Sequence, residues 1–228
     1  MINFSLSSYV LLVVTLFLSV PLTAVCEDMA QTQIVEFPHL GKCEIQARSI
    51  DNNRLPIVQI LNSNKSIIFQ AEMGKPFELG FFPGAGIEFQ VRHIKGLPDP
   101  LIVVVSAGQG GSASPLDVVI IGAVSGRIQL LWKTPAMTTD DGLFIGNLGG
   151  GSGIGIAVWR RDEDDTCHLC PHHFSLQLFP WDNEKSHFCF GSVLNTAGKH
   201  KEEGNALQEL GFGFRNQLTT FTKLKRYF

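Results

Sequence analysis

The stretch that decides the fold runs Asp117-Val118-Val119-Ile120-Ile121-Gly122, turns at Ser125-Gly126 and returns as Arg127-Ile128-Gln129-Leu130-Leu131-Trp132. Two apolar runs rich in β-branched residues and joined by a short glycine turn are typical of a β-hairpin. The same unit occurs over 57–70, with its turn at 62–65, and over 174–190, with its turn at 182–185. The three hairpins recur every 55 to 60 residues. The chain is therefore predicted to repeat one sheet unit.

Further strand candidates lie between the hairpins, at 44–48, 76–82, 87–93, 101–106, 143–146 and 154–160. The run Leu101-Ile102-Val103-Val104-Val105 is apolar on both faces of a strand, which predicts a place in the middle of the fold. A helical pattern occurs over 202–210, with Gly211 as its stop. We predict an all-β domain of about ten to twelve strands with a short C-terminal helix.

Two stretches share one order of elements. Leu101-Ile102-Val103-Val104-Val105-Ser106 is followed by a glycine-rich loop and a hairpin ending at Trp132. Gly142-Leu143-Phe144-Ile145-Gly146 leads through a glycine loop to Ile154-Gly155-Ile156-Ala157-Val158-Trp159 and a hairpin ending at Phe190. This order resembles the FG-GAP repeat of integrin-type β-propellers over roughly residues 97–190.

The resemblance implies a small or partial β-propeller-like domain. A four-stranded blade takes about 40 to 50 residues, so the chain holds at most about four blades. In that family the loop carries carboxylates that hold calcium, whereas Asn147-Leu148-Gly149-Gly150-Gly151 supplies none. We therefore do not expect calcium binding here. A β-sandwich or a barrel built from the same hairpins is the alternative.

The N-terminal segment has the pattern of an export signal. An apolar run over 9–18 is followed by Pro21, and small residues before Cys26 precede the first acidic residues. We predict a signal peptide over 1–26, a β-rich domain over 27–196 and a basic C-terminal segment with the short helix over 197–228, in a secreted or periplasmic protein. The alternatives are an uncleaved N-terminal membrane anchor and a lipid on Cys26, which would be the only attachments to a membrane.

The cysteines are the residues of this sequence with the most specific chemical alternatives. After removal of the signal four cysteines are left, an even number that favours disulfides in an oxidising compartment: Cys43, Cys167, Cys170 and Cys189. The alternative is a zinc site, because thiols two residues apart with nearby imidazoles have the ligand types of a tetrahedral centre: Cys167, Cys170, His172 and His187. Redox exchange at the Cys-x-x-Cys pair is disfavoured, because Pro171 and a strand follow it instead of a helix.

Composition and motifs narrow the function classes. A net charge of -3 with 17% charged residues excludes a strong electrostatic footprint for nucleic acid. The glycine loop at 108–113 precedes a strand instead of the helix that a dinucleotide needs. Acidic residues at 140–141 and 162–165 are typical of solvated loops. Three aromatic residues have the ring area to stack on a sugar but favour core packing: Trp132, Trp159 and Trp181.

The sequence thus predicts an exported, non-catalytic protein that binds a protein or carbohydrate partner through loops at one end of its sheets. No cofactor is expected. The alternative is a secreted hydrolase or metal-dependent enzyme that uses zinc, the cysteine and histidine cluster and the acidic loop.

Overall fold

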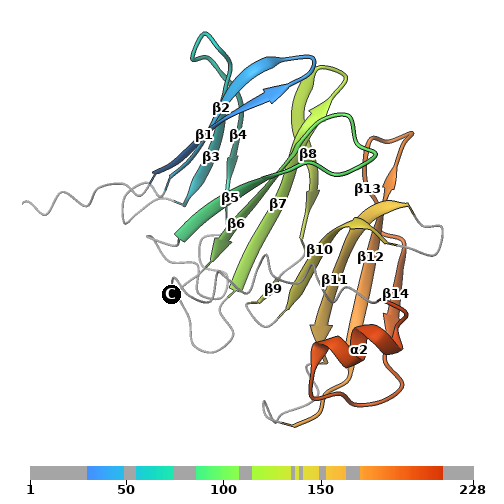
Figure 1. The fold of residues 1–228 in the computed structure, drawn as a ribbon. Helices are drawn as coiled ribbons and strands as arrows, with labels where there is room; N and C mark the ends of the chain where they lie inside the picture. The colour runs from blue at the N-terminus through green and yellow to red at the C-terminus, as the bar shows by residue number, and fades with distance from the viewer. Residues whose placement is uncertain are drawn as a thin grey trace, which may run out of the picture.

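The structure is a computed structural model that describes residues 30–48, 55–73, 86–107, 115–134, 137–138, 141–148, 153–162 and 170–212. In these residues three antiparallel sheets follow one another along the chain, and one short helix comes after them (Figure 1). The predicted all-β fold with a short C-terminal helix is confirmed. The expected signal peptide over 1–26 lies outside the described residues. Within those residues, no helix has the length and apolar character that a membrane crossing requires.

Each sheet is built on an up-and-down meander of four strands that pair in chain order, and the second and third sheets each add a fifth strand outside this order. The first contains β1 (Ala30–Phe37), β2 (Gly41–Arg48), β3 (Ile57–Leu61) and β4 (Ile67–Glu72). The second contains β5 (Gly86–Arg92), β6 (Leu101–Ala107), β7 (Pro115–Val124) and β8 (Arg127–Lys133), with β9 (Met137–Thr138) paired to β7. The third contains β10 (Gly142–Asn147), β11 (Ile154–Arg161) and β12 (Phe174–Asp182), with β13 (His187–Phe188) and β14 (Ser192–Asn195) both paired to β12.

The repeated hairpin of the sequence is the outer half of each sheet. The three predicted hairpins are β3–β4, β7–β8 and β12–β13. The strand candidates at 44–48, 87–93, 101–106, 143–146 and 154–160 coincide with β2, β5, β6, β10 and β11, while the one at 76–82 lies outside the described residues. The helical pattern forms α2 (Glu203–Glu209), and Gly211 follows it with a φ of 82°. The sequence did not predict strands β1, β9 and β14.

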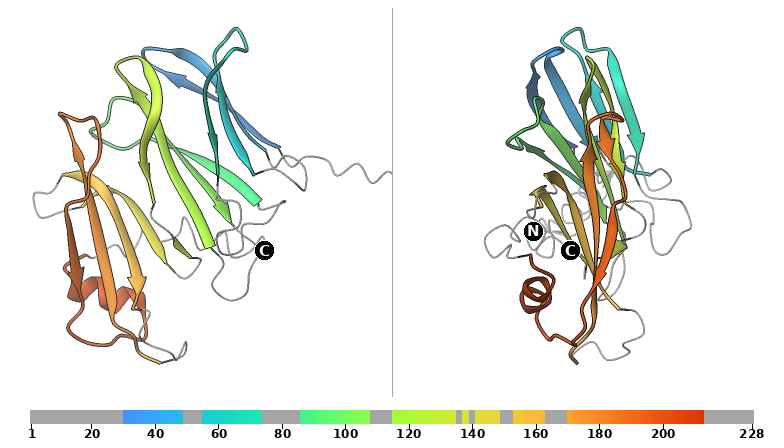
Figure 2. Two further views of the ribbon diagram at one scale, coloured as in Figure 1. Left: turned by 180° about the vertical axis from the view of Figure 1, so that it is seen from behind. Right: turned by 90° about the vertical axis from the view of Figure 1, so that its right-hand side faces the viewer.

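The sheets pack face to face and enclose two apolar layers. Alternate residues of a strand point to opposite faces, so Ile102 and Val104 of β6 enter the layer against the first sheet. Val103 and Val105 enter the layer against the third. This division explains why β6 is buried at all seven positions and confirms its predicted central place. The described residues thus form a stack of three antiparallel sheets with four, five and five strands (Figure 2). The FG-GAP resemblance itself stays a prediction.

The two outer faces of the stack are closed in different ways. On the first sheet, a network of hydrogen-bonded polar side chains crosses β2, β3 and β4; its members are Glu44, Gln46, Arg48, Gln59, Lys65 and Gln70. On the third sheet, α2 covers the outer face and places Ala206 and Leu207 against Phe174, Leu176 and Trp159 (Figure 2). The molecule is therefore a stack of three sheets with a polar face at one end and a helix at the other.

Candidate functional site

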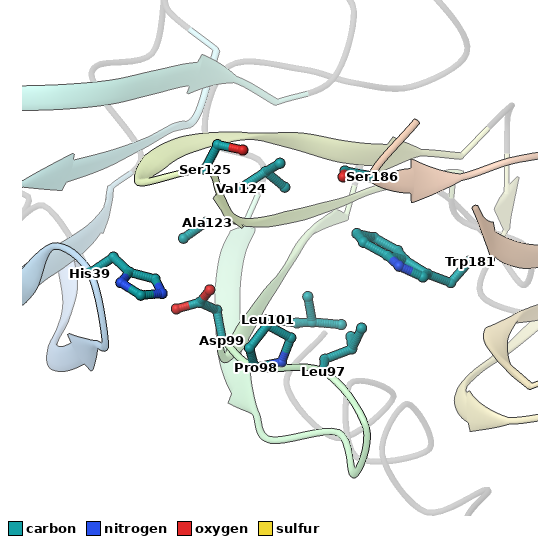
Figure 3. Close-up of a pocket in the computed structure, with 10 residues that line it drawn as sticks. All are labelled: His39, Leu97, Pro98, Asp99, Leu101, Ala123, Val124, Ser125, Trp181 and Ser186. Carbon is teal, nitrogen blue, oxygen red and sulfur yellow. The ribbon is translucent and has the colours of Figure 1, made fainter. Parts of the chain in front are cut away.

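A pocket of about 250 Å³ opens where turns of all three sheets meet. In an up-and-down meander the first and third connections lie at the same end of the sheet, so the β1–β2, β5–β6, β7–β8 and β12–β13 connections gather together. Each of these four connections supplies part of the lining (Figure 3). The lining residues are His39, Leu97, Pro98, Asp99, Leu101, Ala123, Val124, Ser125, Trp181 and Ser186.

Asp99 is held in place by the β5–β6 connection. Its backbone is restricted on both sides, because it lies between Pro98 and Pro100 and a residue that precedes proline avoids the helical region. The connection begins with a tight turn in which the Leu97 N–H donates to the Ile94 carbonyl over 3.0 Å. The Asp99 Oδ1 atom is buried and has no hydrogen-bond partner among the described residues. A buried acceptor without a donor is costly unless something supplies that donor.

Gly96 makes this turn possible. Its φ of 102° lies in the region that L side chains rarely adopt. An added Cβ would also lie 2.8 Å from Cδ1 of Ile154 in the third sheet. The glycine thus lets the β5–β6 connection approach the neighbouring sheet, which brings Asp99 to the pocket.

His39 and Ser125 approach the pocket from two other turns. His39 is exposed in the β1–β2 turn, and its imidazole faces the Asp99 carboxylate (Figure 3). Ser125 and Gly126 both have positive φ, 51° and 72°, as a two-residue type I′ hairpin turn requires. Figure 3 shows the Ser125 hydroxyl pointing away from His39. The residue types of a Ser-His-Asp hydrolase triad are thus present without the serine-to-histidine contact that such a triad needs.

Trp181 supplies the aromatic wall of the pocket. Its Nε1–H donates to Oδ1 of Asn183 over 3.1 Å. Its ring meets Phe188 edge to face, with ring centroids 4.9 Å apart. Asp182 stabilises the turn that follows, because its Oδ1 accepts from the N–H groups of Glu184 and Lys185. The hydrogen bond from the Lys185 N–H is the main reason why the pKa of Asp182 lies below its ordinary value.

The other two tryptophans belong to the core. Trp132 is 6% exposed and meets Phe179 edge to face, with centroids 5.3 Å apart. Trp159 is 2% exposed beneath α2. Among the three tryptophans considered for sugar stacking, Trp181 lines the pocket, Trp132 is buried between the second and third sheets, and Trp159 is buried beneath α2.

The predicted disulfides of Cys43 and Cys189 do not form, because both are free thiols. Cys43 points from β2 into the layer between the first two sheets, and burial raises the pKa of its thiol. Cys189 follows β13 in the third sheet, so the second sheet separates the two residues. Packed sheets are about 10 Å apart, whereas a disulfide requires Cα atoms within about 7 Å. Cys170 is disulfide-bonded, and Cys167 lies outside the described residues.

The alternative zinc set is not brought together. His172 lies two residues before the start of β12, and its backbone bridges that of His200. His187 pairs with Asp182 at the far end of the same strand. At about 3.3 Å per residue the length of β12 alone separates the two histidines by roughly 27 Å, whereas zinc binds imidazole nitrogen at about 2 Å. Across the described parts of the chain, no three His, Cys, Asp or Glu residues form a metal-binding group.

The predicted acidic loops are only partly described. Asp141 accepts a hydrogen bond from the Thr138 N–H over 2.8 Å and lies 3.8 Å from Nε of Arg160. The Asp162 N–H donates to the His173 carbonyl over 3.0 Å. Asp140 and residues 163–165 lie outside the described residues. The described acidic residues thus stabilise connections at the end of the sheets away from the pocket.

The comparisons with known proteins give no relative for this chain. No protein-family model, no curated protein and no solved structure matches it.

Proposed function

We propose that the protein is an exported, non-catalytic binding protein, and that the pocket at the turn end of its sheets receives part of a protein or carbohydrate partner. The observation that carries the proposal is the lining, to which four connections from three separate sheets contribute. Binding residues commonly lie on loops that a rigid scaffold positions. Export is supported by the apolar run over 9–18 and the small residues before Cys26.

The chemistry of the lining supports recognition. Apolar side chains and an indole ring make up most of it, and a few polar groups converge on it: Asp99, His39, Ser125 and Ser186. Ligand sites are usually of this kind, with an apolar lining and a small number of placed polar groups. A volume of about 250 Å³ lies below the range of about 300 to 1,000 Å³ for sites of drug-sized ligands, so the pocket suits one side chain or one sugar ring.

A capture experiment with a matched aromatic control tests this function. Immobilised protein is exposed to a glycan array and to the extracellular protein fraction of its source, as the unchanged chain, as Trp181→Ala and as Phe190→Ala. Phe190 is 62% exposed in the same sheet but does not line the pocket. We expect Trp181→Ala to weaken capture at least about tenfold, as loss of a central aromatic contact does, and Phe190→Ala to leave it unchanged. Capture that survives Trp181→Ala, or no capture at all, contradicts the proposal.

A further inference from the structure

We infer that the group received by the pocket is a cation, the ammonium of a lysine or the guanidinium of an arginine side chain on a protein partner. This inference rests on the proposed function and adds the chemical class of the ligand. It is carried by three features of the pocket: a carboxylate with a buried oxygen that no donor of the described residues reaches, an aromatic wall and an apolar floor.

The charge of the lining is the first feature. Asp99 is the one acidic residue among the lining residues, and no lysine or arginine is among them. Its Oδ1 is buried without a hydrogen-bond donor from the described residues. A cationic N–H donor would supply both the missing hydrogen bond and the missing charge, and hydrogen bonds between charged groups are stronger than neutral ones. A sugar hydroxyl would supply the hydrogen bond but would leave the carboxylate charge uncompensated.

The orientation of Trp181 is the second feature. The polar edge of its indole is already used, because Nε1–H donates to Asn183. Phe188 packs edge to face with the same ring. Trp181 therefore meets a ligand through its apolar ring surface, on which the methylene groups of a long basic side chain pack. Figure 3 shows Asp99 and Trp181 on two sides of the pocket with Leu97 and Leu101 between them, so a basic side chain that lies along the pocket contacts the indole with its methylene groups and the carboxylate with its charged end.

The floor is the third feature. Leu97, Leu101 and Val124 line the pocket beside the carboxylate. The methylene groups of lysine and arginine pack well on apolar surface while the charged end reaches a polar partner. A long basic side chain thus matches the apolar and the acidic parts of the lining at once.

A ligand competes with the His39 side chain for the carboxylate of Asp99. Its imidazole faces the carboxylate from the exposed β1–β2 turn (Figure 3). A cation that reaches Asp99 displaces this ring instead of using it. We therefore expect His39→Gln to bind the cation at least as tightly as the unchanged protein.

Probe binding measured by NMR tests the inference at pH 7.5. The probes are Nα-acetyl-arginine amide, Nα-acetyl-lysine amide, the neutral isostere Nα-acetyl-citrulline amide and methyl α-glucoside. The chain has three tryptophans, so its indole N–H signals are few, and the buried Trp132 and Trp159 report whether the fold is intact. We expect the two cationic probes to shift the Trp181 signal saturably, with the neutral probes at least about tenfold weaker.

Two isosteric variants complete the test. Asp99→Asn removes the charge in the pocket, and Glu72→Gln removes one exposed negative charge from β4 at the end away from the pocket. We expect Asp99→Asn to weaken binding of the arginine probe about tenfold or more and Glu72→Gln to change it less than twofold. Equal binding of the arginine and citrulline probes, or no effect of Asp99→Asn, overturns the inference.

The outcomes separate the inference from the proposed function. If the glucoside shifts Trp181 and the cations do not, the ligand class is wrong while a binding pocket stands. If no probe binds but a partner is captured and Trp181→Ala weakens that capture, the inference of a cationic ligand is likewise overturned, while the proposed binding function stands. If capture also fails, the proposed function falls with it.

Discussion

Gly142 at the start of β10 shows how tightly single residues are fixed in the third sheet. It pairs with Trp159 across the sheet, and the indole ring lies over the position that a Cβ would occupy. The ring has little freedom to move aside, because Trp159 is 2% exposed and its Nε1–H donates to Glu203 of α2 over 3.3 Å. This glycine is therefore required for space and not for backbone conformation.

Gly142→Ala should consequently destabilise the protein. Overpacking of a well-packed core costs about 1 to 3 kcal/mol, and we expect a loss of that size in the free energy of unfolding measured with urea. Gly204 in α2 is the matched control, because nothing lies within 4 Å of its Cβ position. Gly204→Ala should stabilise by up to about 1 kcal/mol through helix propensity. Equal effects of the two substitutions would show that the indole does not occupy the Gly142 site.

Among the elements, hairpins with strong local signals could be predicted and edge strands could not. The hairpins β3–β4, β7–β8 and β12–β13 combine apolar runs with turn residues, so their neighbours in sequence define them. Strand β1 has polar residues at positions 31 to 33 and is held by distant partners. The Gln31 side chain donates to the Phe89 carbonyl and accepts from the Phe89 N–H, over 3.0 and 2.8 Å. Such a contact between sheets has no local sequence pattern.

The pocket could not be predicted either, because it too is formed by residues that are distant in sequence. Its polar residues lie in four connections between positions 39 and 186, and each connection alone resembles an ordinary turn. The Pro98-Asp99-Pro100 run was the available signal, because prolines on both sides fix the backbone of an acidic residue. The prediction concentrated on cysteines and histidines that are close in sequence. Strand β12 separates His172 and His187, which shows that closeness along the chain does not ensure closeness in a sheet.

Helix α2 is tied to its preceding loop by a carboxylate whose effect depends on pH. Glu209 contacts Nε2 of His200 and accepts from the Ala197 N–H over 2.6 Å. The hydrogen bond with His200, followed by that from Ala197, places the pKa of Glu209 below its ordinary value. A carboxyl group with a lowered pKa in the folded state stabilises the protein above its unfolded pKa. That contribution is lost as the pH falls through the folded value.

We therefore expect the free energy of unfolding to fall as the pH decreases below about 4.5, the ordinary pKa of the glutamate side chain. Glu44 and Asp182 contribute in the same direction, because the pKa of each is also lowered by hydrogen bonds. Glu209→Gln should reduce stability at pH 7 and flatten this acid dependence, whereas Glu202→Gln in the same segment should not. Urea unfolding of the three proteins between pH 3 and 7 measures the difference. An unchanged acid slope in Glu209→Gln would contradict it.

At the scale of the whole molecule, the described residues form a stack of three sheets in which both outer faces are closed. Stacked repeats need polar or covered terminal faces to stay soluble. The outer face of the first sheet meets this need with its polar network, in which Arg48 bonds both Gln46 and Gln59 over 2.5 and 3.0 Å. The outer face of the third sheet is apolar and depends on α2. Substitutions at the two ends should therefore have different effects on self-association.

Loss of the contacts of α2 should expose the apolar outer face of the third sheet and cause the protein to self-associate. Leu207 is 2% exposed and packs in the cluster of Phe174, Leu176 and Trp159, so Leu207→Asp places an unpaired charge there and detaches the helix. Asn205→Asp adds the same charge to an exposed position of the same helix and is the control. Light scattering coupled to size-exclusion chromatography should show concentration-dependent oligomers for Leu207→Asp alone, because large apolar patches drive association.

The variant is expected to stay folded, because the two apolar layers between the sheets contain neither Ala206 nor Leu207. A near-ultraviolet circular dichroism signal like that of the unchanged protein would show that Trp132 and Phe179 stay packed, and it would separate self-association of a folded protein from aggregation of an unfolded chain. A folded variant that keeps the mass of the control at every concentration would show that α2 is not what closes this end.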